Sequence, residues 1–276
     1  MTMMHLSYED LTLRNEGYVS LGVQQRIRQT SLLVAGCGIG STIAEALIRI
    51  GFERLTLIDG DTVSLHNLNR QNFTVADIGR PKVDALKSRL LAINPMARIM
   101  ALNDWVTTDN VSDLAAKADI VIDTIDFLDL EAIVALHDES QRQKKPVVSA
   151  LSAGWGAAAL YFPPDTVSSF RDIFGLPKTG SVKGASYVEH FKAVIERLGS
   201  ALGPEIRSVM TRALTVMEDG QFCPAPQISA GACSVAALTV TILHQFLNDN
   251  SVVSAPQLML LNVLNTCSQT EINLAW

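Results

Sequence analysis

Between residues 30 and 153, short apolar runs alternate with longer stretches whose apolar residues recur at helical spacing. The apolar runs, which predict buried strands, span 30–36, 54–59, 98–104, 118–126 and 145–153. The stretches at helical spacing span 41–51, 79–94, 108–117 and 128–144, and another at 18–30 precedes the first strand. Strands that alternate with helices in this way predict an α/β fold with a doubly wound, mainly parallel sheet.

Individual residues predict where these helices begin and end. Gly51 is expected to stop the first long helix, and Pro81 suits the first turn of the helix within 79–94. Thr108 or Asp109 is expected to cap the helix that follows.

After about residue 160 the alternation stops. Residues 162–186 are rich in proline, glycine and serine and show no helical or strand period in their apolar residues. This favours a long excursion from the core that forms a mobile loop over the site. We expect a polar helix near 187–200, an uncharged helix within 223–247, and closing strands at 257–265 and 268–276. These closing strands would extend a Rossmann-like sheet in the antiparallel sense.

The composition narrows the class of protein. The chain has 276 residues, 48% hydrophobic and 18% charged, which is enough apolar material for a sizeable core. Its formal net charge of −6 disfavours a nucleic-acid partner unless a local basic patch overrides it. No charged residue occurs from Cys223 to Leu247, but the polar residues scattered through this stretch favour a buried helix over a membrane span.

Cysteine usage and the N-terminal segment indicate the compartment. The four cysteines, at 37, 223, 233 and 267, form no C-x-x-C pair, so we predict neither a disulfide framework nor structural zinc. The opening residues are polar and of mixed charge, which is not typical of a signal peptide. We therefore expect a cytoplasmic protein with reduced thiols.

A glycine-rich turn joins the first strand to the first long helix. Gly36, Gly38 and Gly40 lie in VAGCGIGS, where the backbone can approach a phosphate and the helix N-terminus offers free N–H groups. Asp59 ends the next strand, where a carboxylate can bind a ribose hydroxyl. A tight packing turn without a ligand is the alternative, and the turn alone leaves both NAD and ATP open.

Polar residues after the second strand favour ATP. Asp61, Asn67, Arg70 and Gln71 follow Asp59 closely, and Lys82 opens the next helix. A dinucleotide site does not need this set, whereas a guanidinium and an ammonium suit a triphosphate. The helix dipole disfavours a cation at Lys82, which also favours a phosphate partner over an ordinary first-turn lysine.

The segments 34–41, 55–73 (LTLIDGDTVSLHNLNRQNF), 77–86 and 93–95 resemble the ThiF/MoeB/HesA family, bacterial relatives of ubiquitin-activating enzymes. Residues 13–36 and 118–127 (ADIVIDTIDF) resemble the stretches before that family's first strand and before its metal-binding aspartate. The resemblance is close over 11–150 and looser afterwards. It implies one adenylation domain over 1–276, with a helical lead-in at 1–30, a nucleotide-binding core at 31–160, a crossover region at 161–227 and a C-terminal helix with strands at 228–276.

The family resemblance also implies roles for individual residues. Asp59 would hold the ribose, Asn67, Arg70, Gln71 and Lys82 the triphosphate, and Asp126 a magnesium ion. Arg14 matches a family arginine that reaches the partner subunit's site, so a homodimer is implied. Asp126 as a helix cap and Arg14 as a solvated surface residue are the alternatives.

The sequence departs from the family pattern at several positions. The turn lacks the family's double glycine, Phe127 replaces a frequent asparagine, and the stretch 165–222 lacks a cysteine that some relatives use to take up the acyl group. Cys223 stands at the edge of that stretch, while Cys37 and Cys233 are expected to be buried.

Three functions are therefore weighed. The first is an ATP-dependent adenylyltransferase acting on the C-terminus of a ubiquitin-like sulfur carrier, a peptide or a small acid. The second is a tRNA-modifying dehydratase of the same family. The third is a non-catalytic member that binds nucleotide or a partner only.

Overall fold

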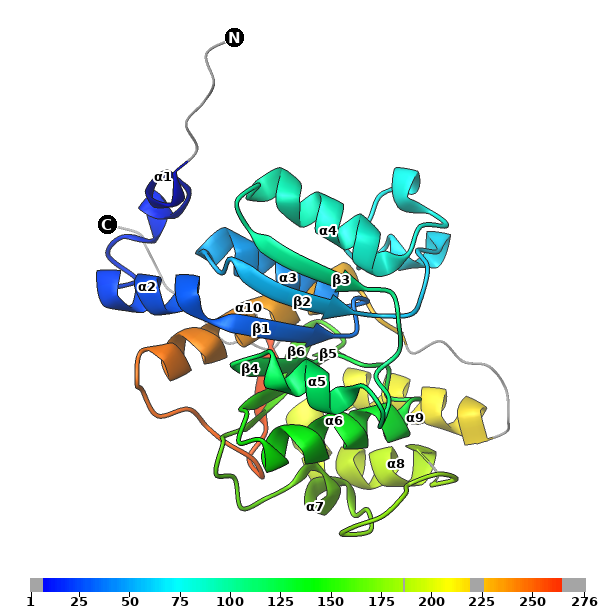
Figure 1. The fold of residues 1–276 in the computed structure, drawn as a ribbon. Helices are drawn as coiled ribbons and strands as arrows, with labels where there is room; N and C mark the ends of the chain where they lie inside the picture. The colour runs from blue at the N-terminus through cyan, green and yellow to red at the C-terminus, as the bar shows by residue number, and fades with distance from the viewer. Residues whose placement is uncertain (1–6, 186, 219–225, 265–276) are drawn as a thin grey trace, which may run out of the picture.

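The computed structural model describes residues 7–185, 187–218 and 226–264 (Figure 1). Within them one seven-stranded sheet runs through the molecule in the order β3-β2-β1-β4-β5-β6-β7. The strands are β1 (Ser31–Ala35), β2 (Arg54–Ile58), β3 (Arg98–Leu102), β4 (Ile120–Asp123), β5 (Val147–Ala153), β6 (Gly156–Phe162) and β7 (Met259–Asn262). β1 to β5 are parallel, and β6 and β7 continue the sheet in the antiparallel sense. The predicted α/β class and the antiparallel extension are both confirmed.

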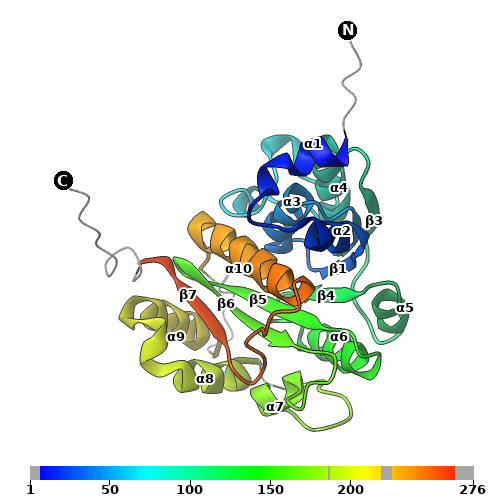
Figure 2. The same cartoon turned by 90° about the vertical axis from the view of Figure 1, so that its left-hand side faces the viewer.

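Helices cover both faces of the sheet because alternate residues of each strand point to opposite sides. On one face Leu32 and Val34 pack with α2 (Leu21–Gln29), α3 (Gly40–Ile50), α4 (Lys82–Ile93) and α10 (Ser229–Leu247). On the other, Leu33 and Ala35 share a cluster with α5 (Val111–Ala116), α6 (Leu130–Arg142), α7 (Phe170–Phe174), α8 (Tyr187–Leu198) and α9 (Pro204–Glu218). Figure 2 shows α10 on the opposite side of β5 to β7 from α8 and α9.

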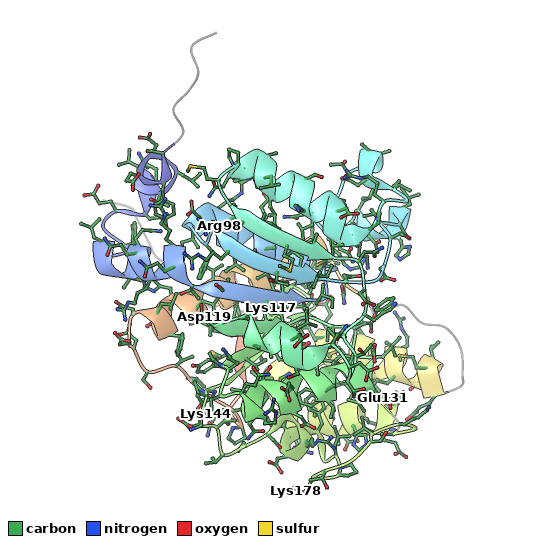
Figure 3. All side chains as sticks on the ribbon, in the orientation of Figure 1. Arg98, Lys117, Asp119, Glu131, Lys144 and Lys178 are labelled. Carbon is green, nitrogen blue, oxygen red and sulfur yellow. The ribbon has the colours of Figure 1, made fainter. Side chains whose placement is uncertain are left out.

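The second face is only partly covered. No helix stands in front of β2 and β3 in Figure 1, and Met100 on β3 is 47% exposed. An open groove there is lined by four cationic side chains, from Arg54, Lys87, Arg98 and Lys117. Figure 3 labels Arg98 and Lys117, which come from β3 and from the end of α5.

The predicted helix ends are partly right. Gly51 ends α3 with φ +116, a left-handed conformation that suits glycine. Pro81 is the N-cap of α4 rather than a first-turn residue, because its ψ of 134 is not helical. The prediction of Thr108 or Asp109 as the cap of α5 is wrong: the N-cap is Asn110, whose Oδ1 accepts from Thr107 N.

The second half of the chain is more regular than its sequence indicates. β6 and α9 were not predicted, and the excursion 162–186 contains α7. Phe170 and Phe174 are buried in the α5–α9 cluster, and Arg171 pairs with Asp138 of α6 at 2.7 Å. These contacts hold the excursion against α6 instead of leaving it as a mobile loop. The closing strand predicted at 268–276 lies outside the described residues.

α10 is long and apolar enough to cross a membrane, and among the described helices it is the one that passes this test. About half of this apolar helix is buried inside the molecule, against α3, β5 and β6. Gly231 lies so close to the β5–β6 turn that an added Cβ would come within 2.4 Å of Gly154 O. This packing agrees with the predicted buried helix.

Candidate nucleotide site

The glycine turn lies at the carboxyl-terminal ends of β1, β2 and β4, because parallel strands end at the same edge of the sheet. Gly36 has φ +88, and a Cβ there would lie 2.3 Å from Thr124 O after β4. Gly40 opens α3, and a Cβ there would lie 2.7 Å from Thr124 Oγ1. Gly36 and Gly40 are therefore required for packing against the end of β4, as well as for any approach of a ligand.

The N-terminus of α3 has no side-chain cap. Its N-cap residue is Ile39, which cannot accept a hydrogen bond through its side chain. Ser41 N and Thr42 N donate to the main-chain oxygens of Gly38 and Ile39, both at 3.1 Å. The positive end of the helix dipole still favours an anion at this position.

Asp59 connects the ends of β1 and β2. The residue is 8% exposed, and its carboxylate accepts from Cys37 N at 2.6 Å and from Asp61 N at 2.8 Å. These bonds hold the glycine turn against the loop after β2. Carboxylate oxygens can accept more than one hydrogen bond, so this bracing is compatible with the predicted ribose role.

Lys82 is a buried cation. Its side chain is 8% exposed, and Nζ lies 2.7 Å from Asp61 Oδ2. Lys82 is also close enough to Cys37 to act on it electrostatically: burial raises the pKa of the Cys37 thiol well above its usual value, and the Lys82 charge opposes that rise. The Lys82 side chain is therefore buried against Asp61, unlike an ordinary solvated lysine in a first helical turn.

The loop after β2 carries two buried amide side chains in different surroundings. Asn67 is 5% exposed, and its Oδ1 accepts from Ser64 N at 2.9 Å. Gln71 lies against the turn, with Nε2 3.2 Å from where a Cβ on Gly38 would stand. Its Oε1 is buried without a hydrogen-bond partner. A buried acceptor without a partner is costly, so Gln71 has capacity for a polar ligand.

Arg70 extends from the same loop. Nε donates to Gln227 Oε1 at 2.6 Å, and Nη1 donates to His66 O at 3.0 Å and to Asn69 Oδ1 at 2.8 Å. Burial lowers the pKa of Arg70, and the nearby charge of Asp126 opposes that shift. The Arg70 guanidinium is thus held by Gln227, His66 and Asn69, within electrostatic reach of Asp126.

Glu45 on α3 fixes the end of this loop. Asn72 Nδ2 donates to Glu45 Oε2 at 2.9 Å, and Arg89 of α4 donates to the same oxygen. Burial alone would raise the pKa of Glu45, but hydrogen bonds from Arg89 and Arg49 outweigh it and lower the pKa below the usual value. One carboxylate therefore joins α3, α4 and the loop.

Three aspartates lie at or just after the end of β4, and they differ in environment. Asp123 is 3% exposed and its Oδ2 contacts His137 Nε2 and Ser149 Oγ, both at 2.9 Å. Asp129 caps α6 by accepting from Ala132 N at 3.1 Å. Asp126 is exposed, and its Oδ1 accepts from Leu128 N at 3.0 Å. The helix cap is therefore Asp129, which leaves Asp126 free to meet a ligand.

No group of three His, Cys, Asp or Glu side chains is placed to hold a metal within the described part of the chain. A magnesium ion at Asp126 would thus depend on one carboxylate plus oxygens of a phosphate ligand, a donor set that Mg²⁺ accepts.

Arg14 is not brought to this set. It lies beside Asn15, whose Nδ2 donates to Ile50 O at the C-terminal end of α3. The glycine turn is at the other end of that helix, about 16 Å away at 1.5 Å per residue. The structure assigns Arg14 an exposed position, and its predicted role in a partner subunit stays a prediction.

Comparison with known proteins gives the family. The ThiF family model matches residues 12–273. The chain belongs to the ThiF family.

Relatives in the ThiF family match about half of this chain. Protein HesA, heterocyst, of Trichormus variabilis is 34% identical over 154 residues, 55% of this chain and 57% of that protein. The sulfur carrier protein ThiS adenylyltransferase of Escherichia coli is 33% identical over 153 residues, covering 53% and 58%. The tRNA threonylcarbamoyladenosine dehydratase of E. coli is 40% identical over 119 residues, covering 42% and 44%. The chain spans about half the length of these relatives.

Solved ThiF-type structures share the fold. PaaA superposes with a TM-score of 0.62 at 18% identity, covering 87% of this chain and 63% of that one. E. coli MccB with ATP superposes with a TM-score of 0.61 at 19% identity, covering 88% of this chain and 64% of that one. The E. coli dehydratase TcdA superposes with a TM-score of 0.59 at 19% identity, covering 87% of this chain and 95% of that one.

Two residues at this ThiF site were not predicted. The indole of Trp105, after β3, lies over Gly60, where an added Cβ would stand 2.4 Å from Trp105 Cε2. Trp105 is 52% exposed beside Asp59, so part of its ring can contact a ligand. Gln227, just before α10, contacts Arg70 and Asn69. Trp105 directly follows the predicted strand 98–104, and this position was a signal in the sequence for a site residue. Nothing in the sequence around Gln227 marks it as a site residue.

The cysteines of this ThiF chain divide by burial. Cys37 is fully buried in the turn, as predicted. The expectation that Cys233 is buried is wrong: it is exposed, because α10 turns Ala232 and Val235 to the core and Cys233 away from it. Cys223 and Cys267 lie outside the described residues.

Proposed function

We propose that the chain is an ATP-dependent adenylyltransferase that activates a carboxylate. The observation that carries this proposal is the placement of two cations beside one glycine turn: the buried Lys82 and the half-buried Arg70. A site for a dinucleotide has no use for both, whereas a triphosphate and its leaving pyrophosphate do. The adenylyltransferase relatives in the ThiF family support the same reading.

The proposed reaction is an in-line displacement at the α-phosphorus of ATP. A carboxylate oxygen of the substrate forms the new P–O bond, the bond to the bridging oxygen breaks, and pyrophosphate leaves with the electron pair. Lys82 and Arg70 stabilise the charge that grows on the leaving oxygens. Asp59 holds the ribose, Asn67 and Gln71 bind polar atoms of the nucleotide, and Trp105 offers a ring face for the base.

Magnesium fits this proposal as a cofactor held by Asp126 and phosphate oxygens. Bound there, the ion neutralises phosphate charge and fixes the phosphates for displacement. Asp126 has a second carboxylate oxygen for which no hydrogen bond is recorded among the described residues, and this supports its assignment as the ligand.

The carboxylate donor is proposed by class only: the C-terminus of a sulfur carrier protein, a peptide or a small acid. ThiS adenylyltransferase is named for a sulfur carrier, and MccB was solved with the peptide MccA. A homodimer in which Arg14 completes the partner subunit's site is part of the proposal, since Arg14 cannot reach the site of its own chain.

A dehydratase acting on modified tRNA is the second candidate. The fold match to TcdA covers 95% of that chain, and the groove over β2 and β3 carries Arg54, Lys87, Arg98 and Lys117. No ion pair is recorded for these four side chains within the described residues. A local basic face of this kind favours a polyanion despite the net charge of −6.

Pyrophosphate exchange tests the leading proposal. Purified protein with ATP, magnesium, labelled pyrophosphate and candidate carboxylates should return label to ATP with one acid class, and NAD should not stabilise the protein against heat. Stabilisation by NAD but not by ATP–magnesium would refute the proposal. Intact ATP binding without exchange for any carboxylate would favour the non-catalytic reading, and salt-sensitive binding to tRNA would favour the dehydratase.

A further inference from the structure

Gln227, at the end of the crossover region, forms hydrogen bonds with the loop after β2. Gln227 precedes α10, and its main-chain oxygen accepts from Asn69 Nδ2 at 3.0 Å. Its side-chain Oε1 accepts from Arg70 Nε at 2.6 Å. Gln227 therefore holds two consecutive residues of the loop that carries the proposed triphosphate contacts.

These contacts fix the orientation of the Arg70 guanidinium. A guanidinium is planar, so fixing Nε and Nη1 fixes the direction of Nη2. Gln227 holds Nε, while His66 O and Asn69 Oδ1 hold Nη1. No acceptor is recorded for Nη2 within the described residues. The third nitrogen is thus the one presented for a ligand.

We propose that Gln227 is a positioning residue, which orients Arg70 so that Nη2 faces the phosphates of ATP. The inference depends on the proposed function, because it assigns Gln227 a role only if Arg70 binds a triphosphate. It makes the start of α10 part of the nucleotide site, although 157 residues separate Gln227 from Arg70. A substrate that shifts the start of α10 would change Arg70 geometry, and by linkage ATP would change affinity for that substrate.

Removing the acceptor should affect triphosphate binding selectively. Without Gln227 Oε1, the Arg70 side chain regains rotamer freedom, and ordering it on a ligand becomes more costly. We expect the preference for ATP–magnesium over AMP, measured as a ratio of dissociation constants, to fall about fivefold to tenfold in Gln227→Met. AMP affinity should stay within about twofold, because AMP lacks the phosphates that Arg70 contacts.

The matched control is Gln25→Met. Gln25 is exposed on α2, far from the glycine turn. It should keep the full ATP-over-AMP preference. Calorimetric titration of both nucleotides with each full-length variant, together with its thermal midpoint, gives the needed values. A loss of ATP and AMP affinity in equal proportion in Gln227→Met would indicate a merely structural role and overturn the inference.

A double-mutant cycle with Arg70→Ala separates positioning from other effects. If Gln227 acts through Arg70, Gln227→Met should change the ATP-over-AMP ratio in the parent protein and leave it unchanged in the Arg70→Ala background. Additive losses would overturn the inference. Should Gln227→Met fold poorly, Gln227→Ala keeps the main-chain contact to Asn69 and gives the same comparison.

The outcomes also separate this inference from the proposed function. If the parent protein binds ATP–magnesium no more tightly than AMP, the triphosphate proposal fails and the role of Gln227 fails with it. If the parent prefers ATP and Gln227→Met keeps that preference, only the positioning role is overturned.

Discussion

The Lys82 ammonium lies 2.7 Å from Asp61 Oδ2, but the two partners differ in their access to water. The Lys82 side chain is 8% exposed and that of Asp61 is 53% exposed. Removing either partner therefore leaves a different residue behind: a half-solvated carboxylate in one case and a buried, unpaired cation in the other.

We predict that Lys82→Met and Asp61→Ala change stability unequally. Lys82→Met should alter the free energy of unfolding by less than about 1 kcal/mol, because water can solvate the remaining carboxylate. Asp61→Ala should cost about 1–3 kcal/mol, because the buried ammonium loses its partner. Urea denaturation of the ligand-free proteins measures both. Equal losses would contradict the assigned burial of Lys82.

Gly36 should be far less tolerant of alanine than Gly79, although both have positive φ. Gly36 has φ +88 with Thr124 O in the way of a Cβ, whereas Gly79 has φ +85 and open space. Gly79→Ala should cost about 1–2 kcal/mol, the strain of the left-handed conformation alone. Gly36→Ala should cost more than about 3 kcal/mol and weaken nucleotide binding, because the end of β4 must shift. Similar costs for the two variants in chemical denaturation would show that the Thr124 contact is not required.

The contribution of Glu45 should depend on pH. Because hydrogen bonds lower its pKa in the folded state, its stabilisation is present above the unfolded value of 4.5 and is lost as pH falls through the lower folded value. Glu45→Gln should be less stable than the parent by about 1–2 kcal/mol near neutral pH, with the difference shrinking below pH 4.5. The exposed Glu16, replaced by Gln, is the control. A difference that stays constant down to about pH 3 would rule out the ionised pair as its source.

Alanine substitutions at Asp126 and Asp129 should distinguish the proposed magnesium ligand from the helix cap. Asp129→Ala removes the side chain that accepts from Ala132 N, so it should lower the free energy of unfolding by about 1 kcal/mol and leave magnesium dependence intact. Asp126→Ala should change stability little and abolish the extra thermal shift that magnesium adds to ATP. If Asp129→Ala rather than Asp126→Ala removes that magnesium effect, the two roles are exchanged.

How far the sequence could predict the fold and the site depends on how local each signal is. Gly51, the strand that ends at Asp59 and the alternation up to β5 are local patterns, and the structure follows them. β6 was missed because GAAALYF lacks the β-branched residues of a typical strand, and it is stabilised instead by burial on both faces. α9 was missed although its buried residues, Ile206 and Leu214, lie eight residues apart, a spacing that places both on one face of a helix.

For the site residues too, those marked by a local sequence pattern could be predicted and those that depend on distant contacts could not. Lys82, Arg70 and Gln71 lie within one short segment whose spacing could be read directly, and the structure brings them to the glycine turn. The sequence could not separate Asp126 from Asp129 as the cap, because each stands within four residues of the start of α6. Gln227 could not be found, since its contact with Arg70 exists only once the crossover region has packed.

The spacing of the site's contacts along the chain has a consequence for biosynthesis. Asp59 meets Cys37 across 22 residues, Thr124 meets Gly36 across 88, and Gln227 meets Arg70 across 157. Since chains fold from the N-terminus as they are made, these contacts can form only in that order on the ribosome. A nascent chain could thus form the Asp59–Cys37 contact of the glycine turn before Gln227 is available to orient Arg70. The contacts proposed for the triphosphate would then be the last part of the site to form.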